Sequence, residues 1–174
     1  MPPRAAHADA DSFLSSAMAS HQGPLLRYAT RLLGDHERAR DVVQDTFMRL
    51  HTQPRASVVD HLAEWLFTVC RHRAMDVLRK EGRARSFGES EFEQLSGTEP
   101  RPGRRLEVEE RREQLRRLVD GLPPNLQEVV RLRFQDGFSY KQISGITGLS
   151  VTNVGFLLHT AVQRLRRQLT DQPE

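Results

Sequence analysis

The feature that most constrains this chain is a pair of helices expected near its end, joined by a tight turn. The first is expected over residues 139–146 and the second over residues 150–169. Ser139 and Gln142 have the spacing of a capping box, in which the serine hydroxyl accepts a backbone N–H and the glutamine reaches back. Gly148 supplies the positive φ that a tight turn between two helices requires.

Apolar residues in this segment are spaced to bury one seam shared by both helices. They are Ile143, Ile146, Leu149 and Val154. The pattern over residues 139–160 is typical of a helix-turn-helix, whose second helix enters the major groove of DNA. An ordinary corner between two helices has the same local sequence. The two serine caps and the basic residues that follow favour DNA binding.

The distribution of charge points the same way. The formal net charge is only +3, but basic residues far outnumber acidic ones between Leu122 and Leu169, which is a plausible nucleic-acid footprint. They are Arg131, Arg133, Lys141, Arg164, Arg166 and Arg167. Only Lys80 and Lys141 are lysines among the 26 basic residues of the chain. Arginine is the better fork for phosphates and base edges, although a GC-rich genome gives the same bias.

Composition predicts an all-α fold. The 174 residues are 37% hydrophobic and 28% charged, and long stretches rich in Leu, Arg, Glu and Gln favour helix. The single cysteine, Cys70, excludes an internal disulfide and suits a reducing cytoplasm, where we expect it to be an inert buried thiol. No apolar run approaches the length of a membrane span, so we expect no membrane insertion.

The chain divides into two expected helical lobes. We interpret residues 1–22 as a disordered leader and residues 23–81 as a bundle of three or four helices. Pro24 is expected to open the first helix, Gly34-Asp35 separates it from the second, and a third runs from about Val59 to Lys80. The expected core of that third helix is Leu62, Trp65, Leu66, Val69, Ala74 and Leu78.

A flexible acidic linker is expected over residues 82–104, where Gly, Pro and Ser accumulate. Its glutamates are Glu89, Glu91, Glu93 and Glu99. The second lobe then covers residues 105–170, with one helix to about Leu122 and another that Pro123-Pro124 opens. This lobe contains the helix-turn-helix.

Three stretches of the chain carry a family resemblance. Residues 34–47 look like the family segment "GD…A.DLVQETF", residues 65–79 like "WL..IARN.A.D.LR", and residues 122–140 like "LPP..REV..LR...G.SY.EIA". In this order, the stretches resemble a bacterial sigma-70 transcription initiation factor of the small extracytoplasmic-function group. The resemblance extends from about Pro24 to Leu169. It implies a factor that binds core RNA polymerase and directs promoter recognition and transcription initiation.

The resemblance also implies where each lobe acts. The first lobe would dock on the clamp helices of the polymerase β′ subunit and open the −10 element, and the second would sit on the β flap and read the −35 element. Asp41, Gln44 and Asp45 share one expected solvent face, suited to a basic partner helix, although a plain solvated face has the same pattern. The residues expected to bind polymerase are Asp41, Gln44, Asp45 and Phe47.

Cations along one helix are expected to hold the DNA strand during opening. The candidate −10 residues are Trp65, Arg71, His72, Arg73, Arg79 and Lys80. Trp65 offers a stacking surface for an unpaired base, or it belongs to the core. His72 stands where the family usually has Asn, so we expect an altered −10 base preference.

The expected recognition helix departs from the family. Basic residues are common there at the positions held by Gly155, Leu157, Thr160 and Val162. The candidate −35 residues are Lys141, Thr152, Asn153, His159 and Arg164. Binding at −35 is therefore expected to be weak, or to rest on a set of basic residues. They are Lys141, Arg131, Arg133, Arg164, Arg166 and Arg167. Three roles stay open for residues 155–157: contact with DNA, packing in the core, or binding of a protein partner.

Other function classes fit less well. A free-standing helix-turn-helix regulator would have no use for the first lobe. An enzyme is not expected, because no phosphate loop, nucleophile–base pair or metal-ligand spacing is present, and Cys70 and His72 would face different ways on a helix. No cofactor or metal is therefore expected.

An anti-sigma factor would be a separate partner chain. The acidic linker would occupy a basic polymerase channel or act as a plain tether.

Overall fold

The computed structural model describes residues 4–82 and 106–170, and the side chains within 9–82 and 108–170. We call residues 4–82 the first lobe and residues 106–170 the second lobe, because the predicted linker separates these two described ranges in the sequence. No strand occurs in either described range, which confirms the predicted all-α fold. The predicted linker lies outside these ranges except for Gly82, so its glutamates are not described.

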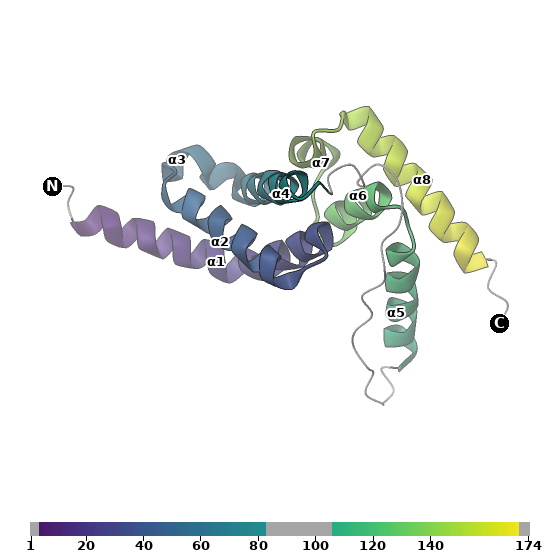
Figure 1. Cartoon of the computed structure of the whole chain (residues 1–174). Coiled ribbons are helices and arrows are strands. Elements are labelled where there is room, and N and C mark those ends of the chain that lie inside the picture. Colours follow the sequence, from purple (N-terminus) through teal and green to yellow (C-terminus); the bar gives the residue numbers. More distant parts are fainter. Residues whose placement is uncertain (1–3, 83–105, 171–174) are drawn as a thin grey trace. The chain divides into compact units, whose positions relative to one another are not determined.

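Four α-helices and one 3₁₀ turn make up the first lobe, and four α-helices make up the second (Figure 1). The elements of the first lobe are α1 (Arg4–Leu33), α2 (His36–His51), α3 (Arg55–Val58), η1 (Val59–His61) and α4 (Leu62–Lys80). Those of the second lobe are α5 (Leu106–Asp120), α6 (Pro124–Phe134), α7 (Tyr140–Thr147) and α8 (Val151–Thr170).

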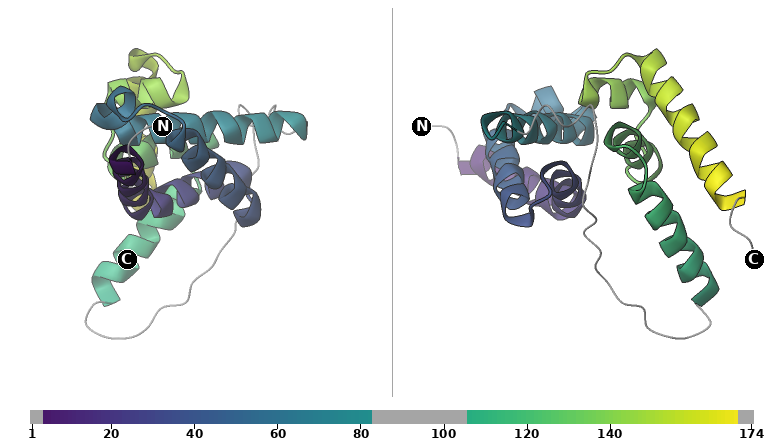
Figure 2. Two further views of the ribbon diagram at one scale, coloured as in Figure 1. Left: turned by 90° about the vertical axis from the view of Figure 1, so that its left-hand side faces the viewer. Right: turned by 45° about the vertical axis from the view of Figure 1, so that its right-hand side comes forward.

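The core of the first lobe lies between α1, α2 and α4, each of which packs against the other two (Figure 2). The aromatic rings of Tyr28 and Phe67 meet there with centroids 5.1 Å apart. The buried residues of this core include Leu25, Ala29, Leu32, Leu33, Ala39, Val42, Val43, Phe47, Leu50, Leu66, Phe67, Cys70, Ala74 and Leu78. The helices therefore enclose one apolar core, as their sequence patterns predict.

The prediction of a disordered leader is wrong for residues 4–22, which are the first part of α1. Pro24 does not open that helix but lies inside it, although proline removes a backbone hydrogen bond there. Tertiary contacts explain the difference. Arg55 of α3 pairs with Asp9 at 2.8 Å and lies over the ring of Phe13, and Ala17 is buried.

The third predicted helix is α4, and it begins at Leu62 because η1 takes up residues 59–61. Its buried stripe is shifted from the predicted one. Phe67 and Cys70 are buried, whereas Trp65 and Val69 are half-buried. The predicted assignment of Trp65 to the closed core is therefore wrong, because the helix turns its adjacent face toward α1 and α2.

Cys70 is a buried thiol, as predicted. Burial raises the pKa of this thiol to about 12, although a hydrogen bond with Thr46 acts in the opposite direction. Thr46 is itself buried, and its hydroxyl donates to the Val42 carbonyl oxygen at 2.8 Å. Because the thiolate is the reactive form of cysteine, this thiol is inert in the folded protein.

Hydrogen bonds fix the end of the first lobe where α2 begins. Gly34 has φ 68°, which L side chains rarely adopt. The Asp35 carboxylate then caps α2 by accepting the Arg38 N–H at 3.1 Å. The Arg38 guanidinium donates to a carboxylate oxygen of Glu81 at 2.5 Å. The N-terminal end of α2 therefore lies beside the C-terminal end of α4.

In the second lobe α6 packs against α8, and α5 contacts both. Pro124 opens α6, as predicted. The Gln127 amide joins α6 to the preceding turn by donating to the carbonyl oxygens of Asp120 and Leu122, each at 2.7 Å. The most buried apolar residues are Leu122, Leu126, Val129, Leu132, Phe138, Ile143, Ile146, Val154, Leu158 and Ala161.

The predicted helix-turn-helix is present as α7 and α8. The Ser139 hydroxyl accepts the Gln142 N–H at 3.2 Å, and the Gln142 side chain accepts the Ser139 N–H at 2.9 Å. Gly148 has φ 77°, and the Ser150 hydroxyl accepts the Asn153 N–H at 3.1 Å. The two helices are bent by 105°, within the range of helix-turn-helix units.

No single helix in the described ranges is long and apolar enough to cross a membrane. Helices α7 and α8 pass that test of length and composition only when taken together, across their 105° bend.

A half-enclosed ion pair joins α5 to α6. The Arg131 side chain is only 13% exposed, and its guanidinium pairs with the carboxylate of Asp120, whose side chain is 56% exposed. Burial lowers the pKa of Arg131, while the charge of Asp120 acts in the opposite direction. The Arg131 Nε has no hydrogen-bond partner among the described residues. The position of the Arg131 side chain is thus fixed by its burial and by its ion pair with Asp120.

We predict that Asp120→Ala lowers the free energy of unfolding by about 1–3 kcal/mol, because it leaves a charged group without its partner in a desolvated place. Glu113→Ala is the matched control. Glu113 pairs with Arg116 at 3.0 Å and with Arg117 at 3.6 Å, both of which are exposed, so its loss is expected to cost about 0.5 kcal/mol or less. Chemical denaturation of both variants measures the difference, and equal losses would contradict this account.

Candidate polymerase and DNA interfaces

The outward face of α2 carries the predicted polymerase-binding residues. Asp41 and Gln44 are exposed, and the exposed side chain of Met48 follows one turn later. Asp41, Gln44 and Met48 lie on one face because residues three and four apart are neighbours on a helix. The opposite face supplies the core, so α2 presents a narrow acidic and polar strip with one apolar side chain at its end.

Met48 is a candidate that the sequence analysis did not single out. It is 62% exposed, unlike the other large apolar residues of α2. Its spacing of four residues from Gln44 is a signal that was present in the sequence.

The two remaining polymerase candidates lie differently. Asp45 is half-buried and forms an ion pair with Arg73 of α4. Phe47 is only 5% exposed, so its ring packs in the core and is not available for direct contact with a partner. The strip that a partner could contact directly is thus Asp41, Gln44 and Met48, with Asp45 at its edge.

The predicted −10 residues line α4. His72, Arg79 and Lys80 are exposed, and Trp65, Arg71 and Arg73 are half-buried. The Arg79 guanidinium donates to the Asp76 carboxylate at 2.9 Å, an exposed pair of the kind that contributes little to stability. Arg73 pairs with Asp45 and so joins the predicted polymerase and DNA residues. The half-buried Trp65 keeps part of its surface accessible for stacking.

The predicted −35 residues are all exposed. They are Lys141, Thr152, Asn153, His159 and Arg164. Thr152 and Asn153 lie in the first turn of α8, the part of a recognition helix that contacts base edges. Lys141 lies in the first turn of α7, and Arg164 lies in the second half of α8.

Two arginines that were expected to support −35 binding are engaged within the lobe. Arg131 is enclosed and pairs with Asp120. The Arg133 guanidinium donates to the Phe138 carbonyl oxygen at 3.0 Å and lies 5.5 Å from the ring centroid of Tyr140. The Arg131 side chain is therefore largely enclosed, whereas Arg133 is exposed, and its contact with DNA stays a prediction.

The uncharged segment of α8 has three different environments. Gly155 lies against Tyr140, since a Cβ at Gly155 would stand 3.5 Å from the Tyr140 ring. Phe156 is 65% exposed, and Leu157 is half-buried. A shallow hollow of about 250 Å³ adjoins the segment. It is lined by Phe134, Tyr140, Gly155, Leu158, His159, Val162, Gln163 and Arg166.

Among the described residues, no group of His, Cys, Asp and Glu is arranged to hold a metal ion. Cys70 is fully buried and His72 is exposed, so the two side chains lie on different faces of α4, as predicted.

Comparison with known protein families matches both lobes. The model of sigma-70 region 2 matches residues 17–84, and the model of sigma-70 region 4 matches residues 112–165. The sigma factor SigL of Mycobacterium tuberculosis, of the extracytoplasmic-function group, is 34% identical over 158 residues, covering 87% of this chain and 85% of SigL. The chain belongs to the extracytoplasmic-function group of sigma-70 factors.

Other relatives agree with this assignment. The ferric citrate uptake sigma factor FecI of Escherichia coli is 27% identical, covering 85% of this chain and 86% of FecI. SigE of Mycolicibacterium smegmatis is 27% identical over 86% of this chain, which spans only 58% of SigE.

A solved structure supports the fold. The sigma factor RpoE of Bartonella quintana, in complex with the anti-sigma factor NepR, matches with a TM-score of 0.58 and 23% identity, covering 95% of this chain and 99% of that one.

For this sigma factor we predict that Gly155→Lys strengthens binding of the full chain to duplex DNA. A Cβ at this position would make only an ordinary contact with Tyr140, so a lysine side chain can be accommodated without a steric clash. Each added phosphate contact steepens the salt dependence of binding by about 0.9. Gly155→Ala is the control, because it removes the same glycine without adding charge. A mobility-shift titration at several salt concentrations compares them. Equal affinity and equal salt dependence of the two variants would mean that this face of α8 does not approach DNA.

Proposed function

We propose that the protein binds core RNA polymerase through the outward strip of α2 and directs it to promoters, where α4 holds the opened −10 strand and α8 contacts the −35 element. Sigma factors are initiation subunits that bind core polymerase and promoter DNA.

The observation that carries the proposal is the contrast between the two faces of α2. Six residues of one face are buried, whereas Asp41 and Gln44 on the other are exposed, and no hydrogen bond or ion pair within the described residues engages them. An acidic, hydrogen-bonding strip complements a basic partner helix, and complementary charge directs association and orientation. The exposed Met48 adds an apolar contact at the end of the strip.

The basic residues of α4 support the strand-holding role. Arg79 and Lys80 are exposed at the C-terminal end of the helix, and the exposed pairing of Arg79 with Asp76 is weak enough to yield to a phosphate. Trp65 presents part of its ring for stacking on an unpaired base. His72 is exposed, so it is free to contact DNA at the position where the family usually has Asn.

The second lobe supports −35 contact of modest strength. Its exposed polar readers are few, and each good base contact contributes about 1–3 kcal/mol. Binding to the polymerase β flap would raise the local concentration of the lobe at the −35 site. We therefore assign discrimination at −35 to Thr152, Asn153 and His159, with Lys141 and Arg164 as phosphate contacts.

The proposal makes the protein a binding subunit and not an enzyme. It acts with the polymerase on the chromosome, which in a bacterium is in the cytoplasm. A free-standing regulator is not favoured, because the match to region 2 covers most of the first lobe. An anti-sigma factor is a candidate second partner. The exposed side chains of Phe134 and Phe156 are apolar surface that a protein partner would cover.

We predict that Asp41→Arg lowers the affinity for core polymerase by at least about tenfold, equivalent to about 1.4 kcal/mol, because it places a cation against a basic partner. The wild-type chain is expected to bind core polymerase and to give discrete run-off transcripts from genomic DNA. The variant is expected to give few of them. Fluorescence anisotropy of the labelled chain and run-off transcription are the two measurements.

Asp60→Arg is the matched control, because Asp60 is also exposed in the first lobe but lies outside α2. Both changes add the same charge, so a nonspecific charge effect would appear in both. Absence of polymerase binding by the wild-type chain would contradict the proposed function. Equal affinity of all three proteins would remove the α2 strip from the interface.

A further inference from the structure

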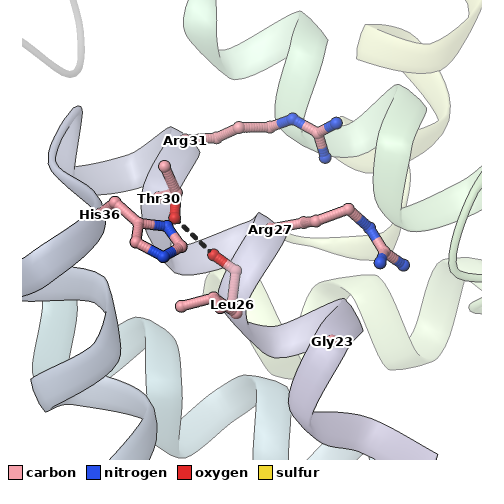
Figure 3. Close-up of a pocket in the computed structure, with 6 residues that line it drawn as sticks. All are labelled: Gly23, Leu26, Arg27, Thr30, Arg31 and His36. Atoms are coloured by element: carbon pink, nitrogen blue, oxygen red, sulfur yellow. Dashed lines mark hydrogen bonds between the residues drawn. The ribbon is translucent and has the colours of Figure 1, made fainter.

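A second basic feature lies in the first lobe, between the C-terminal part of α1 and the start of α2. It is a pocket of about 440 Å³ (Figure 3). Its lining consists of Gly23, Leu26, Arg27, Thr30, Arg31 and His36. Half of these residues carry or accept positive charge, and none is acidic. A pocket with this lining favours an anion.

The two arginines are placed to act together. Arg27 and Arg31 are one turn apart on α1, and Figure 3 shows both side chains extending from the helix in the same general direction. Like charges at this spacing repel each other and destabilise a helix slightly. Arg27 makes no hydrogen bond or ion pair with any described residue, in contrast to Arg38, which pairs with Glu81. The Arg27 guanidinium is therefore available to a ligand.

The rest of the pocket leaves room beside the charges. The Thr30 hydroxyl donates its proton to the Leu26 carbonyl oxygen at 2.7 Å, so this proton is not available for a hydrogen bond to a ligand. Leu26 is half-buried and offers an apolar wall. Gly23 keeps one side open, because a Cβ there would meet only the end of the Arg27 side chain, at 3.6 Å. The pocket thus offers positive charge beside an apolar wall and an open side.

The pocket lies at the same end of the lobe as the last residues of α4. His36, which lines the pocket, is the first residue of α2. Arg38, two residues further on, contacts Glu81, the residue that follows α4. Lys80 precedes Glu81 directly and is one of the proposed strand-holding residues. The basic surface at the end of α4 is thus near the pocket within one lobe.

We propose that this pocket binds a backbone phosphate of single-stranded DNA, adjacent to the segment held by α4. The inference rests on the proposed function. The Arg27 guanidinium holds the phosphate through charge-assisted hydrogen bonds, the strong kind for this pair of groups. Arg31, one turn away, adds positive charge beside it, and the sugar lies against Leu26. The site extends the path of the opened promoter strand beyond Arg79 and Lys80.

The test uses the full chain and a short fluorescein-labelled single-stranded oligonucleotide of mixed sequence, titrated at several salt concentrations and followed by anisotropy. Replacing both arginines, Arg27→Gln with Arg31→Gln, is expected to weaken binding about tenfold and to lower the salt slope by about 0.7, the value for one phosphate on a single strand. Arg40→Gln with Arg49→Gln is the charge control, because it removes the same charge from two exposed arginines of α2 that lie outside the pocket.

A second pair of variants blocks the pocket without changing charge. Gly23→Met fills the open side and is expected to weaken oligonucleotide binding at least about fivefold. Gly23→Ala adds only a Cβ in ordinary contact and is expected to bind as the wild type does. Both replacements favour helix over glycine, so loss of folding does not explain a difference between them.

Core polymerase binding by the same variants separates this inference from the proposed function. Normal polymerase binding together with weakened oligonucleotide binding supports the pocket. Oligonucleotide affinity in the double arginine variant equal to that of Arg40→Gln with Arg49→Gln would overturn it. So would a loss of polymerase affinity with unchanged oligonucleotide binding, since the surface would then contact protein. A wild-type chain that binds the oligonucleotide but not polymerase would refute the proposed function alone.

Discussion

The packing of one apolar stripe of α2 against α1 and α4 is the constraint on which the first lobe depends. Ala39, Val43 and Phe47 lie in the closed core, and a helix that buries one stripe must turn the opposite face outward. The polar residues at Asp41 and Gln44 are therefore presented by the same packing that stabilises the fold. The strip is built on a rigid helix and not on a loop, which favours a defined orientation of a bound partner helix.

The ion pair between Asp45 and Arg73 connects this face to α4. One partner borders the proposed polymerase strip and the other belongs to the proposed DNA face, so the two surfaces share an edge within the first lobe. The end of the same lobe is closed by Arg38 and Glu81. These contacts fix how α2 and α4 present their polar faces. The second lobe relies on the largely enclosed Arg131, whose ion pair with Asp120 joins α5 to α6.

Local signals in the sequence predicted local structure well. The capping box at Ser139 and Gln142 and the positive φ of Gly148 depend on neighbouring residues only, and the structure has both. The predictions were wrong where contacts between residues far apart in the sequence determine the structure. Arg55 holds the helix that continues through residues 4–22, and the register of α4 toward its neighbours leaves Trp65 half-buried. The sequence likewise did not reveal the ion pair between Arg131 and Asp120, because the packing of α5 against α6 brings the two residues together.

Oxidative footprinting of Met48 determines whether core polymerase covers the outward strip of α2. Met48 is 62% exposed, and Met18 of α1, at 37%, is an internal reference. Exposed methionine oxidises readily, and a bound partner would shield it. Hydroxyl-radical treatment of the full chain with and without core polymerase, read by mass spectrometry, is expected to show strong protection of Met48 and little change at Met18. Unchanged oxidation of Met48 in a chain fully bound to polymerase would contradict the account.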